Sequence, residues 1–139
     1  MRLATTFLLA ALSFPVAARD CALCGTWRSN EAKTLADIEA RVPTYPAGLR
    51  KFFGKLTIEY TATASRAYLA GEQKAEDAAW MPYTLEVRPA GKPWLLRTAG
   101  ADGKWLETAI EVRDDCYRVL VPTKQGPGFH EYFCRVAKR

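Results

Sequence analysis

In the run Leu106-Glu107-Thr108-Ala109-Ile110-Glu111-Val112, every second residue, beginning with Leu106, suits a protein interior. The residues between them suit a face exposed to water. Successive side chains of a β-strand point to opposite faces, so this period of two is typical of a half-buried strand. The same period recurs in residues 56–61 and 83–88. The three segments together predict antiparallel strands with one face on a core and the other in water.

Shorter strand candidates lie between and around these three segments. Turn-forming residues separate them, including Ala90-Gly91-Lys92-Pro93 and Gly100-Ala101-Asp102-Gly103. The polar, alanine-rich residues 71–79 predict a loop with room for one helical turn. About eight strands with short connections predict a mainly β fold, an antiparallel up-and-down β-barrel. The shorter candidates are residues 25–28, 65–69, 94–98, 116–121 and 130–136.

A helix-turn-helix unit is predicted between the first strand and the rest of the chain. Ser29 and Asn30 can cap a helix, whose apolar side chains then follow three and four residues apart until Pro43. Pro46 opens a second short helix, which Gly54 closes. The apolar side chains are Leu35, Ile38 and Val42 in the first helix and Leu49, Phe52 and Phe53 in the second.

The N-terminus has the pattern of a cleavable signal peptide over residues 1–18. Arg2 precedes a nearly continuous apolar stretch, and Val16-Ala17-Ala18 supplies the small residues of a cleavage site. The stretch is too short to span a bilayer, so we expect no stable membrane anchor. Asp20 before Cys21 argues against lipidation of that cysteine. We therefore expect a periplasmic or secreted protein in which residues 19–139 form a single domain.

The four cysteines, Cys21, Cys24, Cys116 and Cys134, all follow the expected cleavage point. An even number in an oxidising compartment predicts two structural disulfides. Gly25 after Cys24 excludes a haem-attachment motif, and no βαβ pattern supports a thioredoxin-type motif. Four cysteines allow three pairings, and the sequence leaves all three open.

The sequence argues against several other function classes. The formal net charge is +5 at pH 7, but the basic residues are scattered, so we expect no nucleic-acid partner. The single histidine, His130, begins a strand candidate and has no evident catalytic or metal-binding companions. We therefore expect no catalytic residues, no metal, no cofactor and no enzyme activity.

A family resemblance rests on both ends of the mature chain. Gly25-Thr26-Trp27 resembles the Gly-x-Trp start of lipocalins, and Arg135 stands where their closing arginine stands. The run from Gly25 to Leu35 and the ending Glu131-Tyr132-Phe133 are similar to small bacterial exported lipocalin-like (calycin-type) proteins. The resemblance implies that Arg135 packs over Trp27 and closes the base of the barrel. It also implies that the helix pair, similar to the lid of fatty-acid-binding proteins, caps the other end.

The resemblance favours binding of a small hydrophobic or amphipathic ligand inside the barrel. We expect Phe52 and Phe53 of the helix pair and Tyr60 and Tyr83 of the strands to contact it. Glu131 and Arg135 share a strand face with Phe133. If this face is interior, the two charges must pair, and if it is exterior they form a surface pair of little value; alternation leaves both open. The alternative is a small inhibitor or interaction module that acts on an exported protein partner. The candidate ligand-binding residues are Phe52, Phe53, Tyr60, Tyr83, Glu131 and Arg135.

Overall fold

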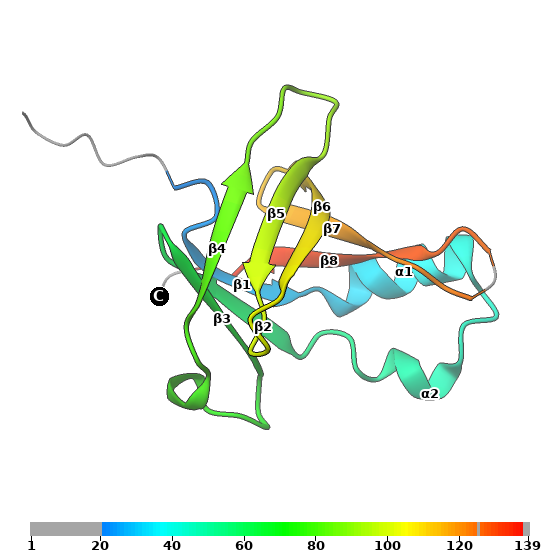
Figure 1. Ribbon diagram of the computed structural model, residues 1–139. Helices are drawn as coiled ribbons and strands as arrows, with labels where there is room; N and C mark the ends of the chain where they lie inside the picture. Colours follow the sequence, from blue (N-terminus) through cyan, green and yellow to red (C-terminus); the bar gives the residue numbers. More distant parts are fainter. Residues whose placement is uncertain (1–20, 125, 138–139) are drawn as a thin grey trace, which may run out of the picture.

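The computed structural model describes residues 21–124 and 126–137. Eight antiparallel strands follow one another in sequence order and close into a barrel when β8 pairs with β1 (Figure 1). The predicted up-and-down barrel is therefore confirmed, while the predicted signal peptide lies outside the described residues. The strands are β1 (Gly25–Ser29), β2 (Leu56–Tyr60), β3 (Ala64–Leu69), β4 (Met81–Glu86), β5 (Trp94–Ala99), β6 (Trp105–Arg113), β7 (Cys116–Val121) and β8 (Phe129–Arg135).

The barrel wall is uneven in strength around its circumference. β5 and β6 pair over six residues, from Trp94 opposite Ile110 to Ala99 opposite Trp105. β3 and β4 pair only through Ala64 opposite Pro82 and Ser65 opposite Met81. Beyond these two pairs the strands separate towards the predicted loop, which contains one 3-10 turn, η1 (Ala75–Asp77) (Figure 1). The β3–β4 seam is consequently the least hydrogen-bonded junction of the wall.

The first predicted helix is present as α1 (Glu31–Arg41). The Asn30 side chain accepts a hydrogen bond from the backbone N–H of Lys33 at 3.0 Å, as a capping residue does. The second helix, α2 (Ala47–Arg50), has four residues and ends before Phe52. Residues 51–54 form tight turns instead, with Phe53 N–H donating to the carbonyl of Arg50. A helical period over so few residues is weak evidence for a helix, which explains the difference.

α1 completes the hydrogen bonding of β8 after β1 has ended. β1 pairs with β8 only from Trp27 to Ser29, opposite Arg135 to Phe133. The first residues of β8, before Phe133, therefore have no partner in β1. The Thr34 hydroxyl accepts from the N–H of Tyr132 at 3.1 Å, and the Asp37 carboxylate accepts from the N–H of His130 at 2.6 Å. Helix side chains thus take the place of a neighbouring strand, because buried backbone groups need partners.

Two apolar clusters form the interior. The larger fills the barrel from its base and contains Leu23, Trp27, Tyr60, Tyr83, Leu96, Ile110, Tyr117 and Phe133. The smaller lies between the helices and the β7–β8 hairpin, where Ile38 and Val42 pack with Phe129. Tyr45 and Phe53 stack edge to face on Phe129 at 4.8 and 5.5 Å between ring centroids. The helical unit is therefore anchored beside the barrel by a core of its own.

The disulfides join Cys21 to Cys24 and Cys116 to Cys134. Cys116 and Cys134 are directly opposite each other on β7 and β8, so this bridge ties the closing hairpin together. The Cys21–Cys24 bridge holds the short segment that carries Leu23 under the barrel. In the described part of the chain, none of the helices has the length and apolar character that crossing a membrane requires.

Candidate functional site

One end of the barrel is sealed by Trp27, Arg135 and the segment that precedes β1. The Arg135 guanidinium lies 4.3 Å from the Trp27 ring and donates to the carbonyls of Cys24 and Ala22, both at 2.7 Å. The Trp27 indole N–H in turn donates to the carbonyl of Leu23 at 2.7 Å. Leu23 and Trp27 are almost fully buried, so this end of the barrel is filled with side chains.

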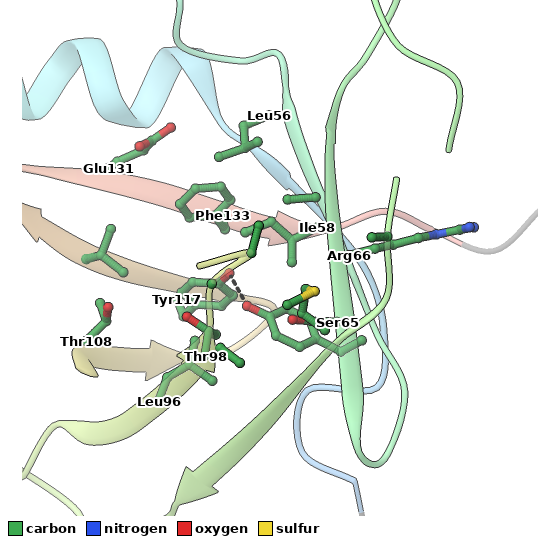
Figure 2. A pocket seen from close by; sticks show the side chains of 18 residues that line it. Leu56, Ile58, Ser65, Arg66, Leu96, Thr98, Thr108, Tyr117, Glu131 and Phe133 are labelled. Carbon is green, nitrogen blue, oxygen red and sulfur yellow. Dashed lines mark hydrogen bonds between the residues drawn. The ribbon is translucent and has the colours of Figure 1, made fainter. Parts of the chain in front are cut away.

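Above this base the barrel holds a cavity of about 530 Å³ (Figure 2). Its walls are mainly apolar and come from β2 to β8 and from the β5–β6 turn. Leu56, Phe133 and Leu96 lie around it in the close-up view. A predominantly apolar cavity of this size with a few polar groups is typical of small-molecule sites, which span about 300–1,000 Å³. The remaining lining side chains include Ile58, Ala67, Ala79, Met81, Thr98, Thr108 and Val119.

Two tyrosines supply neutral polar groups at the inner end of the cavity. The hydroxyls of Tyr60 and Tyr117 are hydrogen-bonded to each other at 3.1 Å (Figure 2). Burial raises the pKa of Tyr60 to about 12 and that of Tyr117 well above its usual value. Both phenols therefore remain protonated at neutral pH, and they can exchange hydrogen bonds with a ligand without introducing charge.

Glu131 brings a carboxyl group to the cavity wall. Its Oε1 atom accepts a hydrogen bond from the Ser29 hydroxyl at 2.8 Å, and Ser29 accepts one from the backbone N–H of Gly54 at 3.0 Å. Burial raises the pKa of Glu131 above its usual range, against an opposing effect of the Ser29 hydrogen bond. Desolvation disfavours the charged form of a carboxyl group, which accounts for the direction.

Gly54 makes this arrangement possible through its backbone. Its φ angle of +89° lies in the left-handed region that side chains rarely adopt. A Cβ atom at this position would also lie 3.0 Å from the Cβ of Glu31. Glycine thus allows the chain to pass close to α1 and present its N–H to Ser29.

Arg66 is the other charged residue of the cavity wall, but its charge is directed elsewhere. Its guanidinium pairs with the Glu59 carboxylate at 2.6 Å and lies 4.5 Å from the centroid of the Trp80 ring. The side chain extends away from the cavity (Figure 2). Within the described residues, no salt bridge includes Glu131, so the carboxyl group meets the cavity without a cationic partner.

The structure brings together some of the candidate ligand-binding residues and separates others. Tyr60 and Glu131 line the cavity, and Tyr83 packs against Tyr60 with ring centroids 5.2 Å apart. Phe53 belongs to the helix cluster, and the Phe52 side chain is 58% exposed, so neither lines the cavity. α1 accordingly lies along β8, and the two phenylalanines that follow α2 do not cover the cavity.

The predicted pairing of Glu131 with Arg135 is wrong. The face of β8 that carries Glu131 and Phe133 is interior, but Arg135 lies at the closed base and Glu131 lies four residues before it along the same face. Each charge has a different partner, Ser29 for Glu131 and backbone carbonyls for Arg135. The extended rise of a strand, about 3.3 Å per residue, separates them by more than the reach of an ion pair.

Sequence reasoning missed Ser29 and Tyr117 as members of the site. Ser29 is expected to cap the helix, but it ends β1 and turns its hydroxyl inwards to Glu131. Tyr117 lies next to Cys116 in a strand candidate without clear alternation. The sequence therefore could not predict that its side chain points into the barrel. The register of β7 against β8 places Tyr117 opposite Phe133 and settles its direction.

No protein-family model, curated protein or solved structure matches this chain. The closed antiparallel barrel is compatible with a lipocalin-like fold, and the functional argument rests on the cavity. Among residues 21–124 and 126–137, no group of three His, Cys, Asp or Glu side chains is arranged to hold a metal ion. A second hollow of about 760 Å³, between residues 88–94 and 111–118, is lined by side chains of both charges and is more polar.

Proposed function

We propose that this protein is an exported, lipocalin-like binding protein that carries a small hydrophobic or amphipathic ligand inside its barrel. The observation that carries the proposal is the apolar cavity of about 530 Å³ above a sealed base. Its polar groups are few and convergent, as in sites that orient one ligand. We propose binding without catalysis, because a neutral tyrosine pair and a single carboxyl group suit recognition.

Two features support export and membership of the small bacterial lipocalin-like group. The two disulfides are typical of proteins that fold in an oxidising compartment. The contact of Arg135 with Trp27 reproduces the base closure that the Gly-x-Trp resemblance implies. A periplasmic or secreted location would let the barrel take up its ligand from the cell envelope or the medium.

The cavity also favours ligand binding over the alternative, an inhibitor or interaction module for an exported protein. A module of that kind needs a protruding surface and is served best by a solid core. The barrel is solid only at its base, and the space above it has the volume of a ligand site. Native mass spectrometry of the protein purified from its own host would detect a retained small molecule.

A pair of matched substitutions tests the proposal in vitro. Thr108→Trp places an indole in the cavity, whereas Thr84→Trp makes the same change at an exposed position of β4. We expect N-phenyl-1-naphthylamine to fluoresce on binding to the native protein and to Thr84→Trp, and to lose this binding in Thr108→Trp. Circular dichroism would establish that both variants are folded. Equal binding by folded Thr108→Trp and Thr84→Trp would place the probe outside the cavity and overturn the proposal.

A further inference from the structure

The charge balance of the cavity wall points to the chemistry of the ligand. Glu131 and Arg66 are the two side chains of opposite charge in the wall, and Arg66 is neutralised outside by Glu59. An ionised carboxylate that faces an apolar space without a cation is costly, because it loses solvation and gains no partner. A ligand that supplies the missing cation would remove this cost on binding.

The hydrogen bonds behind Glu131 prepare the carboxyl group to meet such a ligand. A backbone N–H can only donate, so Gly54 fixes Ser29 as the acceptor of that bond and leaves the Ser29 proton for Glu131. Oε1 of Glu131 is thereby held as an acceptor. The two successive hydrogen bonds, from Gly54 to Ser29 and from Ser29 to Glu131, orient the carboxyl group. The bond from Ser29 also favours the ionised form of Glu131, whereas burial disfavours it.

The rest of the cavity is suited to the apolar body of the same ligand. Leu56, Phe133 and Val119 flank the carboxyl group, and the neutral Tyr60–Tyr117 pair lies deeper in the barrel. We propose, building on the ligand-binding function proposed above, that the ligand is a cationic amphiphile, with a protonated amine on Glu131 and a hydrocarbon body in the cavity. Fatty acids, which the lid-like helices would suggest, are disfavoured because their carboxylate would meet that of Glu131.

The surroundings of Glu131 contain few groups that compete for this role. On β7, Tyr117 is the titratable side chain that faces it, and it stays neutral. On β1 and at the start of β2 the neighbours are Ser29, Gly54 and the apolar Leu56. On α1, Glu31 lies close to Gly54, and it brings no cation to the surroundings of Glu131.

Three probes with one tail and different head groups test the inference: decylamine, decanol and decanoate. At pH 7.5 the amine is protonated, as Lys is, and decanoate is ionised, as Glu is. We expect decylamine to bind tightest to the native protein and decanoate weakest, measured by displacement of N-phenyl-1-naphthylamine. Glu131→Gln keeps the shape and the acceptor for Ser29 but removes the charge. It should weaken decylamine about ten- to a hundredfold, the value of one charge-assisted hydrogen bond, and leave decanol within about threefold.

Glu107→Gln provides the matched control, because the Glu107 carboxylate is exposed on the outer face of β6 and pairs with Arg97. It makes the same charge change and should leave all three affinities unaltered. Decylamine binding to the native protein should also weaken as the pH falls and Glu131 takes up a proton, and Glu131→Gln should abolish this dependence.

The outcomes separate the two proposals. If decanol or decanoate binds the native protein as tightly as decylamine, or if Glu131→Gln does not weaken decylamine, the amine inference is overturned and the binding function stands. If none of the three probes displaces N-phenyl-1-naphthylamine from the native protein, the binding function for this class of ligand fails, and the inference fails with it.

Discussion

Arg135 connects the end of β8 to the segment before β1 at the base of the barrel. It stacks on Trp27 and donates to two carbonyls of the segment before β1. Arg135→Met retains much of the side-chain length but removes the charge and all the donors. We expect the free energy of unfolding to fall by about 1–2 kcal/mol, the value of such charged hydrogen bonds at an accessible position. Urea unfolding followed by tryptophan fluorescence measures it.

Arg97→Met is the control for that substitution, because Arg97 makes an exposed ion pair with Glu107 across β5 and β6. Surface pairs of this kind contribute little, so we expect a much smaller loss of stability than in Arg135→Met. Equal losses in the two variants would contradict a special role for Arg135 in closing the barrel.

The carboxyl group of Glu131 makes stability depend on pH. Burial raises its folded-state pKa above the ordinary value of 4.5. Below 4.5 the group is protonated in both folded and unfolded states and has no effect. As the pH rises from 4.5 through the raised folded-state pKa, the unfolded chain releases its proton more readily, and the native state loses stability.

Glu131→Gln should remove this pH dependence, because the amide does not titrate. We expect the variant to match the native protein in stability at pH 4 and to exceed it at pH 7.5, in urea unfolding without added ligand. A native protein that gains stability relative to Glu131→Gln as the pH rises would contradict the direction of the shift.

Individual residues differ in how far the sequence could place them. Trp27 and Arg135 match the Gly-x-Trp start and the closing arginine of the resemblance, and their contact is as expected. The interior direction of Glu131 had no such marker, because Tyr132 and Cys134 on the other face of β8 are also largely apolar. Its partner Ser29 is far away in sequence, and only the pairing of β1 with β8 brings the two together.

At the scale of the elements, α1 acts as a substitute for a strand along β8. The buried Thr34 hydroxyl is the acceptor for the N–H of Tyr132. Thr34→Val keeps the shape and a similar helix propensity but leaves that N–H without its acceptor. We expect a loss of about 1–3 kcal/mol in the free energy of unfolding, together with faster hydrogen exchange at the Tyr132 amide in NMR spectra.

Two further variants frame that result. Thr34→Ser restores the hydroxyl and should restore the protection of the Tyr132 amide, while Thr84→Val makes the same change on the exposed face of β4 and should leave stability nearly unaltered. Unchanged exchange at Tyr132 in Thr34→Val would show that the helix does not complete the strand edge.

The helical unit also shows the limit of pattern reasoning for short elements. Capping residues and eleven helical positions made α1 predictable. The Pro46–Gly54 segment has the end signals of a helix but too few residues between them to offset the cost of starting one. Phe53 and Tyr45 are instead ordered by Phe129, a contact between distant parts of the chain that no local pattern reveals.

For the whole molecule, period-two alternation and turn residues were sufficient to predict eight strands in an up-and-down barrel. They could not predict how evenly the wall is hydrogen-bonded, because that depends on the register between strands. β3 and β4 form only two residue pairs, and beyond these they diverge towards the loop of residues 70–80. The cavity lies directly behind this seam, since Ala67 and Met81 both line it.

The β3–β4 seam should therefore be the part of the barrel that opens most readily. Local opening takes the least free energy where backbone hydrogen bonds are fewest. We expect peptides from β3 and β4 to exchange deuterium faster than peptides from β5 and β6, which share six residue pairs, in hydrogen-exchange mass spectrometry. Decanol bound in the cavity would pack against Ala67 and Met81 and should slow exchange at the seam more than elsewhere. Uniform exchange around the barrel, with no local effect of decanol, would show that the wall opens only as a unit and that ligands enter by the end of the barrel.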